Sequence, residues 1–405
     1  MSRPLSLPAP RSAAAPLAAL FAAQALATGA TTISVSLSSI LAAQLSGQEA
    51  LAGLPSTLNM LASAASAYGA SRVMAARGRR VGLTAAYLLG ALGAGVAGLS
   101  AIMGVFWLFL LGGALVGVAA GAIQQGRYAA AELVAPAVRG RVMGYLLSFA
   151  VVGAFASAAF SPALTRLGAR LEVGAVELGW LLGAVFLALG GALIALLMPA
   201  RTLEAGISET ASVRARSLRA IFMQPAALTA LLALGIGQGV MVMLMVLMPK
   251  HAEHLGHGLP TISGLITAHV VGMYGLAWAV GGLVDRFGER RALACGALLL
   301  LVSALTAVPA TGAAPMGLSL YLLGLGWNFC FVSGSSLLVR AVMPEDRLRA
   351  QGAADVVVWS CAAAGALGGG VLMATAGFVA VAALGGIASL GALVAAATLR
   401  QPDRA

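Results

Sequence analysis

The sequence predicts an all-α integral membrane protein of twelve transmembrane helices, arranged as two six-helix halves. The composition is the first reason, since 60% of the 405 residues are hydrophobic and 9% are charged, whereas an average soluble domain has about 25% charged residues. The second is a series of long apolar segments, rich in Ala, Leu and Gly, that lack the polar alternation of β-barrel strands. The third is a repeat of loop residues between the two halves of the chain.

A helix needs about 20 mostly apolar residues to cross a bilayer. Twelve stretches meet this requirement: residues 17–43, 50–73, 81–103, 105–126, 141–164, 176–198, 226–248, 260–283, 292–310, 315–338, 351–374 and 377–398. The first stretch is long for a signal peptide and is followed by no evident small-residue cleavage site, so we expect it to be kept as a membrane span.

The basic residues predict the orientation of the chain. With twelve spans, both termini lie on one side of the membrane, and that side carries 21 of the 24 Lys and Arg residues. The other side carries the remaining three, Arg166, Arg170 and Lys250. Cytoplasmic loops of membrane proteins accumulate Lys and Arg, so we expect both termini in the cytoplasm. The net charge of +11 is explained in the same way, and no nucleic-acid partner is expected.

The longest polar connection divides the predicted spans into two sets of six. We predict an N-terminal half of residues 1–199, a cytoplasmic linker of residues 200–225 and a C-terminal half of residues 226–405. The segment 136–144 matches the segment 344–352 at an offset of 208, with a Pro, two Arg and a Gly in the same places. A second pair of matching segments, 77–80 and 287–291, follows the second span of each half.

The loop after the eighth span carries the most specific motif. It comprises a Gly, an Asp-Arg pair, a second Gly and two basic residues, namely Gly281, Asp285, Arg286, Gly288, Arg290 and Arg291. This motif resembles the loop motif of the major facilitator superfamily, whose halves are parallel six-span repeats. The resemblance implies a major facilitator fold and alternating access, with the motif acting as a conformational gate. In the first half, Ala75 and Ala76 replace the Asp and the Arg.

Two neighbouring spans carry side chains that suit a soft metal ion. Met241 and Met245 on the seventh span, and His269 and Met273 on the eighth, are each spaced i, i+4, so the members of a pair share a helix face. Thioethers select Cu(I), and imidazole binds many transition metals. Because the two spans are antiparallel, Met241 and His269 are expected at similar depth. An ionisable residue within a span is a candidate functional residue.

All four histidines of the chain lie in or beside this region. His251, His254 and His257 are spaced three apart in a predicted outer loop, where they could concentrate a metal ion at the entrance. A His-rich solvated loop is the alternative interpretation. Equally, a pair of methionines in an apolar helix is commonly core packing, and His269 could be a hydrogen-bonded structural residue.

A Met-x-x-x-Met pair followed by a His-x-x-x-Met pair in the next helix is similar to the bacterial CcoA-like copper importers of this superfamily. The resemblance implies copper uptake across the inner membrane for assembly of cbb3-type cytochrome c oxidase, with Met241, Met245, His269 and Met273 as the metal-binding residues. A copper ion or a small copper complex would be the transported substrate. The resemblance further implies a lipid-embedded, multi-pass monomer without a bound cofactor.

Two other functions stay open. One is a proton-coupled drug or metabolite exporter of the same superfamily, although the fifth span lacks the glycines expected around its Pro162 and no carboxylate lies at mid-depth. The other is a membrane copper receptor or assembly factor that does not transport. An enzyme is not expected, and no Gly-rich phosphate loop suggests ATP-driven transport.

The remaining polar candidates lie near the cytoplasmic side. Glu132 and Asp355 are expected to pair with arginines at an inner gate rather than to carry protons. The three cysteines show no pairing pattern, so we expect buried thiols rather than disulfides and assign them no role: Cys295, Cys330 and Cys361.

Overall fold

The structure, a computed structural model, describes residues 13–35, 38–48, 51, 54–200 and 216–398. Within these ranges the regular elements are helices. Residues 201–215, which form most of the predicted linker, lie outside the described residues. The division of the chain at residues 199 and 226 therefore stays a prediction.

The helices of the first half follow the predicted spans except the first, residues 17–43, where the structure has two separate helices, α1 (Ala14–Val35) and α2 (Ser38–Ser46). The others are α3 (Leu54–Arg77), α4 (Arg79–Ile102), α5 (Phe106–Ile123), α6 (Gly126–Glu132), α7 (Arg139–Leu171) and α8 (Ala175–Leu197), with a 3₁₀ turn at Pro136–Val138 before α7. Helix α6 continues the path of α5 and extends the fourth predicted span to Glu132.

The second half contains α9 (Leu218–Phe222), α10 (Pro225–His254), α11 (Leu259–Val270), α12 (Ala277–Phe287), α13 (Glu289–Ala307), α14 (Ala313–Ala341) and α15 (Pro344–Thr398). A π-helical turn, Val271–Gly275, joins α11 to α12, and the eighth span bends by 41° there. The prediction for this region was a single span, residues 260–283, without a bend marked in it. At the bend Gly272 packs so closely on α14 that a Cβ would lie 2.2 Å from the Tyr321 carbonyl oxygen.

Nine helices among the described residues are long and apolar enough to cross a membrane, or ten if the bent pair is one span. Two further predicted spans account for the difference between ten and twelve. Helix α3 is 24 residues long but less apolar than the others. Helix α15 contains two spans, because its 55 residues include a kink at Gly377, where φ is 79°. The path of the chain thus matches the predicted all-helical membrane fold.

Two glycines mark equivalent turns in the two halves. Gly78 between α3 and α4 has φ 87°, and Gly288 between α12 and α13 has φ 86°. Residues with a Cβ rarely adopt this conformation. The repeat seen in the sequence therefore has a backbone counterpart at the turn after the second span of each half.

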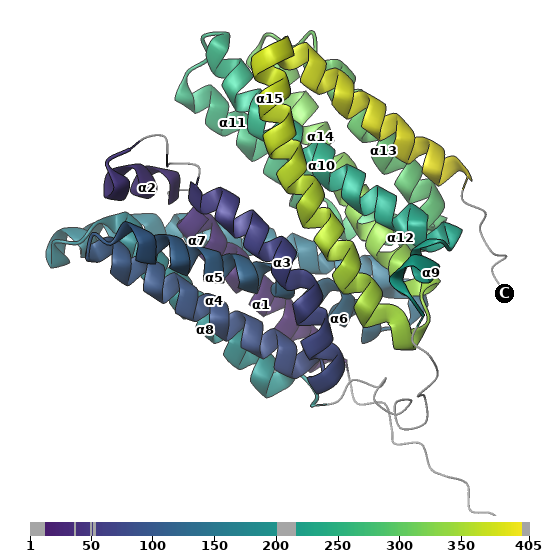
Figure 1. Cartoon of the computed structure of the whole chain (residues 1–405), viewed down its shortest axis with the longest axis horizontal. Helices are drawn as coiled ribbons and strands as arrows, with labels where there is room; N and C mark the ends of the chain where they lie inside the picture. Colours follow the sequence, from purple (N-terminus) through teal and green to yellow (C-terminus); the bar gives the residue numbers. More distant parts are fainter. Residues whose placement is uncertain (1–12, 36–37, 49–50, 52–53, 201–215, 399–405) are drawn as a thin grey trace, which may run out of the picture.

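The helices form two bundles that are separated at one end and meet at the other (Figure 1). We call these the α2 end, where α2 and the start of α11 lie, and the α9 end, where α9 lies. Two clusters of buried hydrophobic residues fill the bundles, one drawn mainly from each half. The halves are joined by contacts of α3 with α15 and of α7 with α12. The fold is therefore two packed bodies with a shared seam toward the α9 end.

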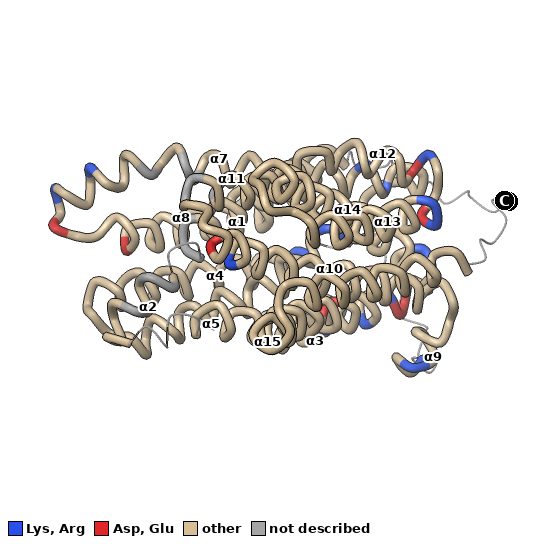
Figure 2. The backbone as a smooth tube through the Cα atoms, turned by 90° about the horizontal axis from the view of Figure 1, so that it is seen from above, with Lys and Arg blue, Asp and Glu red and all other residues tan. Residues whose placement is uncertain are grey.

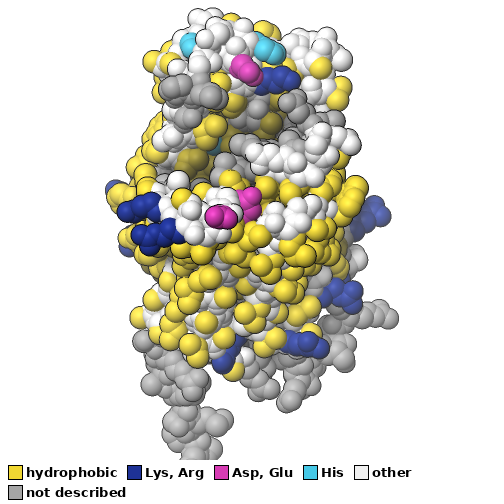
Figure 3. Space-filling model, turned by 90° about the vertical axis from the view of Figure 1, so that its left-hand side faces the viewer, with side chains coloured by type: hydrophobic (Ala, Val, Ile, Leu, Met, Phe, Trp, Pro, Cys, Tyr) yellow, Lys and Arg dark blue, Asp and Glu magenta, His cyan; other side chains and the backbone are white. Residues whose placement is uncertain are grey.

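Charge and shape differ between the ends. Most Lys and Arg residues lie toward the α9 end of the backbone, and few lie at the opposite tips of α7 and α8 (Figure 2). Figure 3 shows a hollow between two lobes, lined mainly by hydrophobic side chains, with His side chains gathered on the upper lobe. The molecule is thus open at the end that carries little positive charge.

The cysteines are free thiols, as expected, but their burial differs. Cys330 is buried in α14 and Cys361 is partly buried in α15. Cys295 is exposed on α13, so the prediction of a buried thiol was wrong there. Its helix lies at the edge of the bundle, where an apolar thiol can face lipid.

Candidate functional site

His269 is the ionisable residue of the eighth span, and it is fully buried. Its Nδ1 lies 3.0 Å from the carbonyl oxygen of Leu320 on α14. A carbonyl can only accept a hydrogen bond, so Nδ1 carries the hydrogen and Nε2 carries the lone pair. Nε2 is buried and has no hydrogen-bond partner among the described residues. The neutral imidazole is therefore held in one tautomer, and its acceptor nitrogen has no hydrogen-bond partner among the described residues.

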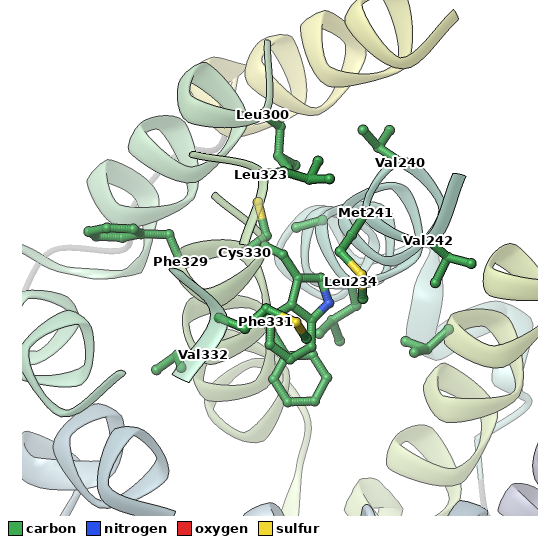
Figure 4. Packing of buried hydrophobic residues seen from close by; sticks show 14 of the residues in the cluster. Leu234, Val240, Met241, Val242, Leu300, Leu323, Phe329, Cys330, Phe331 and Val332 are labelled. Atoms are coloured by element: carbon green, nitrogen blue, oxygen red, sulfur yellow. The ribbon is translucent and has the colours of Figure 1, made fainter. Parts of the chain in front are cut away.

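Met241 and Met245 lie on the face of α10 that packs against α14. Gly237, one turn before Met241, fixes this face, because a Cβ there would lie 3.0 Å from the Cβ of Cys330. Met241 is buried and Met245 is half-buried. Figure 4 shows Met241 in the same packed region as Cys330 and Phe331. Met241 is therefore part of the buried cluster of the second half, and Met245 packs against that cluster.

Met273 lies in the π-helical turn and is also buried. Gly324 of α14 packs against this segment, since a Cβ there would lie 2.3 Å from the His269 carbonyl oxygen and 2.7 Å from the Met273 nitrogen. The four predicted ligands are thus on two helices that both pack on α14. Their role as a metal site stays a prediction.

The outer histidines are placed differently from expectation. His251 and His254 belong to the last turn of α10 rather than to a loop, because the helix continues to His254. The His251 ring stacks on Phe378 with a centroid distance of 4.2 Å, and His257 Nε2 lies 2.7 Å from the Thr311 carbonyl oxygen. No group of three or more His, Cys, Asp or Glu side chains in the described ranges could hold a metal ion. Metal recruitment by these histidines stays a prediction, and two of them already have packing or hydrogen-bond partners.

An aromatic group next to the methionines was missed from the sequence. The Trp327 indole Nε1 donates to Gln238 Oε1 at 2.8 Å. The Trp327 ring stacks on Phe331 at 4.7 Å and meets the edge of Tyr274 at 6.0 Å. These residues come from α10, the π-helical turn and α14. In the sequence, this group could have been found from a Gln and a Trp that lie within two apolar spans.

A buried ion pair joins the two halves. Arg127 of α6 donates to a carboxylate oxygen of Asp355 on α15, and both side chains are almost completely buried. Arg127 Nε also donates to Ser335 Oγ at 3.0 Å, and its guanidinium lies over the Tyr128 and Phe331 rings. The expected pairing of Asp355 with an arginine is confirmed. This pair ties α6 to α14 and α15.

A second buried network lies beside it. Arg79 Nε donates to Glu132 Oε2 at 3.0 Å within the first half. Gln351 of α15 completes the network, accepting from Arg79 and donating to Glu132 Oε1 at 3.3 Å. Glu132 therefore pairs with an arginine, as expected. The Gln351 amide makes this pair part of the seam between the halves.

The loop motif contacts the other half directly. Asp285 accepts hydrogen bonds from the backbone N–H groups of Gly140 at 2.8 Å and Arg141 at 2.7 Å, at the first turn of α7. A carboxylate at a helix N-terminus is favoured by the unpaired N–H groups and the helix dipole. Gly281 allows the close approach, since a Cβ there would lie 2.1 Å from the Gly140 carbonyl oxygen.

The other motif residues have local contacts. The Arg286 guanidinium lies 5.3 Å from the Phe287 ring centroid, and Arg290 donates to the Ala397 carbonyl. Gly288 forms the turn described above. Arg291 starts α13 beside Arg290. Asp285 and Gly281 are therefore the motif residues that reach the opposite half, while a gating role of the set stays a prediction.

Comparison with known proteins agrees with this architecture. The family description "Major Facilitator Superfamily" matches residues 19–342 and 242–405. The chain belongs to the major facilitator superfamily. It is a multi-pass membrane protein and a secondary transporter rather than an enzyme.

Relatives of this major facilitator have different degrees of characterisation. It is 31% identical over 390 residues to the uncharacterized MFS-type transporter YdeG of Bacillus subtilis (strain 168), covering 92% of this chain and 87% of that protein. It is 28% identical over 363 residues to the riboflavin transporter RfnT of Brucella anthropi, covering 88% of each. These relatives leave the substrate of this chain open.

Solved structures match over the whole fold. The E. coli fucose:proton symporter FucP superposes with a TM-score of 0.77 at 17% identity, covering 97% of this chain and 100% of that one. A bacterial homologue of the iron transporter ferroportin in an outward-facing state has a TM-score of 0.72 at 16% identity, covering 94% and 98%. At these identities the likeness concerns the fold alone.

The repeat of this major facilitator extends to its ion pairs. Arg79 and Glu132 pair in the first half, and Glu289 and Arg340 pair at the equivalent positions of the second, at 2.9 Å. The acid and the base have exchanged places between the halves. Arg127 and Ser335, which contact each other, are themselves 208 residues apart. The contact therefore crosses the axis that relates the two repeats.

Replacing Asp285 with alanine is expected to loosen the contact of α12 with α7. The change leaves the Gly140 and Arg141 N–H groups without their carboxylate, and loss of a helix cap typically costs about 1 kcal/mol. The thermal midpoint of the purified protein should fall by a few degrees. Arg286→Ala is the matched control, because Arg286 contacts the neighbouring Phe287 ring rather than the opposite half within the described part of the chain. Equal midpoints for both variants would contradict the role of the Asp285 contact.

Proposed function

We propose that this transporter imports copper, with Met241, Met245, His269 and Met273 as the residues that carry the ion. The main support for this proposal is the arrangement of the His269 imidazole. Its Nδ1–H is fixed by the Leu320 carbonyl, and its Nε2 is buried and unpaired. Histidine ligands of metals commonly have this arrangement, in which a backbone carbonyl holds one ring nitrogen so that the other can bind the metal.

The surrounding donors favour a soft ion. Thioethers suit Cu(I), and hard cations prefer carboxylates and carbonyls. A thioether also has no proton to lose, so Met241 and Met245 can bind without deprotonation. Both methionines and His269 border α14, and a modest rotation of side chains within this packed region would be needed to enclose an ion. Copper, as a bare ion or a small complex, is the proposed substrate and no resident cofactor is needed.

The charge distribution supports an orientation of the transporter in the membrane, and import is the direction that we propose for it. If the basic α9 end faces the cytoplasm, as the positive-inside rule expects, both termini are cytoplasmic and the open α2 end faces outward. The described conformation is then ready to receive substrate from outside. We propose the bacterial inner membrane as the location and a monomer as the working unit, with the imported copper supplying cbb3-type cytochrome c oxidase.

A second candidate is a flat aromatic solute such as riboflavin. The observation that favours it is the Trp327, Phe331 and Tyr274 group, with Gln238 as a hydrogen-bonding side chain. Stacking on aromatic rings suits a conjugated ligand. A relative that is 28% identical is named a riboflavin transporter. The two candidates use neighbouring but different side chains, so they can be separated by mutation.

Copper accumulation should depend on Met241 and His269. Cells that lack their own copper importer would express wild type, Met241→Leu or His269→Phe, and both variants keep most of the volume while removing the donor atom. We expect copper uptake to fall by at least about tenfold in each, as is typical when a metal site is perturbed. Cellular copper measured by mass spectrometry, at matched membrane levels of protein, is the readout.

Met243→Leu is the matched control. Met243 is on the same helix but packs toward α15, where a Cβ at Gly369 would lie 2.6 Å from its Cγ. This variant should keep wild-type copper uptake. Wild-type uptake in the Met241 and His269 variants would reject the copper site, and riboflavin uptake lost in Trp327→Ala would support the second candidate. Copper accumulation in proteoliposomes separates a transporter from a receptor that only binds.

A further inference from the structure

The two contacts that join the halves are related by the internal repeat. In one, α7 crosses α12, and a Cβ at Gly144 would lie 2.1 Å from the Ala277 carbonyl oxygen. In the other, α15 crosses α3, and a Cβ at Gly352 would lie 2.1 Å from Ser71 Oγ and 3.2 Å from the Ala67 carbonyl oxygen. Gly352 follows Gly144 by 208 residues, and Ala277 follows Ala67 by 210. In both contacts, therefore, the second span of one half meets the fifth span of the other half.

One of these contacts contains a carboxylate and the other contains a cavity. Asp285 fills the α12–α7 contact and bonds to Gly140 and Arg141. Its counterpart in the α3–α15 contact is Ala75. There the structure has an open surface cavity of about 670 Å³, lined by Tyr68, Arg72, Ala75, Ala76 and Arg349. The cavity lies where the missing carboxylate would have reached.

The cavity is positively charged by two side chains from opposite halves. Arg349 is the counterpart of Arg141, and Arg72 is an additional base at the position equivalent to Gly282. Arg72 is exposed. Arg349 is held in place, since its Nη1 donates to the Arg216 carbonyl at 3.0 Å and lies 3.6 Å from Asp346 Oδ1. An acidic neighbour outside the cavity lining thus orients Arg349, and Arg72 has no acid among the lining residues.

The positive charge here comes from side chains rather than from a helix end. Helix α7 begins at Arg139, so the N–H groups next to Asp285 are at its first turn. Helix α15 begins earlier in the repeat, at Pro344, so Arg349 already lies inside the helix. A ligand for this place must therefore be recognised by guanidinium groups. Arginine matches the geometry of phosphate oxygens by paired hydrogen bonds.

We infer that the Arg72–Arg349 cavity binds a phosphate group, which joins α3 to α15 as Asp285 joins α12 to α7. The phosphate belongs either to the headgroup of an anionic phospholipid or to free inorganic phosphate. Anionic lipids are attracted to basic segments beside membrane helices. Because the ligand bridges the halves at the closed end, it stabilises the described conformation. This inference does not depend on which substrate is carried.

The full-length protein in nanodiscs provides the test. Its thermal unfolding midpoint would be measured in phosphatidylcholine, in phosphatidylcholine with phosphatidylglycerol, and in phosphatidylcholine with inorganic phosphate. Ligands that bind the native state raise the midpoint. Four proteins are compared: wild type, Arg72→Ala, Ala75→Asp and Arg77→Ala. Arg77 is an exposed arginine of the same helix that does not line the cavity, so it controls for general charge effects.

We expect phosphatidylglycerol or phosphate to raise the midpoint of wild type and Arg77→Ala. In Arg72→Ala the apparent affinity should fall by at least about tenfold, which corresponds to about 1.4 kcal/mol. Ala75→Asp should have a higher midpoint without ligand and no further rise, because its own carboxylate occupies the place. A response to the lipid alone identifies the headgroup, and a response to phosphate alone identifies the free ion. Equal responses in all four proteins, or none in wild type, would overturn the inference.

Discussion

Asp355→Asn is expected to lower the stability of the protein more than any other single substitution considered. It is also expected to abolish transport. The substitution leaves the Arg127 guanidinium buried without its carboxylate. Removing one partner of a buried ion pair typically costs roughly 3–5 kcal/mol, since the remaining charge is uncompensated. In this chain the lost contact also separates α6 from α15, so the closed α9 end should open. The measurements are the thermal midpoint in detergent and substrate uptake at matched protein levels.

Two further variants make this prediction specific. Arg340→Ala removes the exposed member of the Glu289–Arg340 pair, whose side chain is 43% exposed, whereas Glu289 is 8% exposed. Glu289 keeps the hydrogen bond from Ser336 and its place in the first turn of α13, so this change should cost less than Asp355→Asn. Arg127→Met combined with Asp355→Leu removes both buried charges and should recover much of the stability. Transport should remain impaired in the double variant, because the reversible polar contact between the halves is gone. A double variant as unstable as Asp355→Asn would show that packing, rather than charge, causes the loss.

Gly144→Val is expected to shift the transporter away from the described conformation. Even a Cβ at Gly144 would lie 2.1 Å from the Ala277 carbonyl oxygen, which is backbone and cannot rotate away. Helices α7 and α12 must therefore separate, and the α9 end can no longer close. A cysteine introduced near the α9 end, in a background without the native cysteines, should become several times more reactive toward a water-soluble maleimide.

Gly282→Ala is the matched control for this change. Gly282 is on α12 next to the contact, yet a Cβ there meets nothing within 4 Å. Its labelling rate should equal that of the unmodified background. If Gly144→Val labels at the same rate as Gly282→Ala, the crossing of α7 and α12 does not control the closed end. Transport by Gly144→Val should fall strongly, because alternating access requires both conformations.

Most helices were predictable from the sequence because bilayer thickness sets their length. Apolar runs of about 20 residues and the offset of 208 between repeats were sufficient for the path of the chain. The bend at Val271–Gly275 was not predictable, since it depends on how closely Gly272 meets α14. Likewise, His251 and His254 were assigned to an outer loop after the span that ends at residue 248, whereas α10 continues to His254.

The site was predicted only in part for a related reason. Residue type and spacing identified His269, but its free Nε2 depends on the Leu320 carbonyl of another helix. Arg127 was counted among the basic residues of the inner loops, although it is buried against Asp355. The partner of Asp285 is a pair of backbone N–H groups, which no side-chain pattern reveals. Tertiary contacts, rather than composition, decide these roles.

The exchanged ion pairs bear on how the two repeats diverged after duplication. In each half, both members of the pair belong to that half, Arg79 with Glu132 and Glu289 with Arg340. An inversion of sign in one half therefore required two substitutions in that half and none in the other. A chimera that takes one whole half from a homologue would therefore receive both members of that half's ion pair. Only the contact of Gln351 with Arg79 and Glu132 would have to be preserved between the two halves. Each half can therefore change its own ion pair without a matching change in the other half.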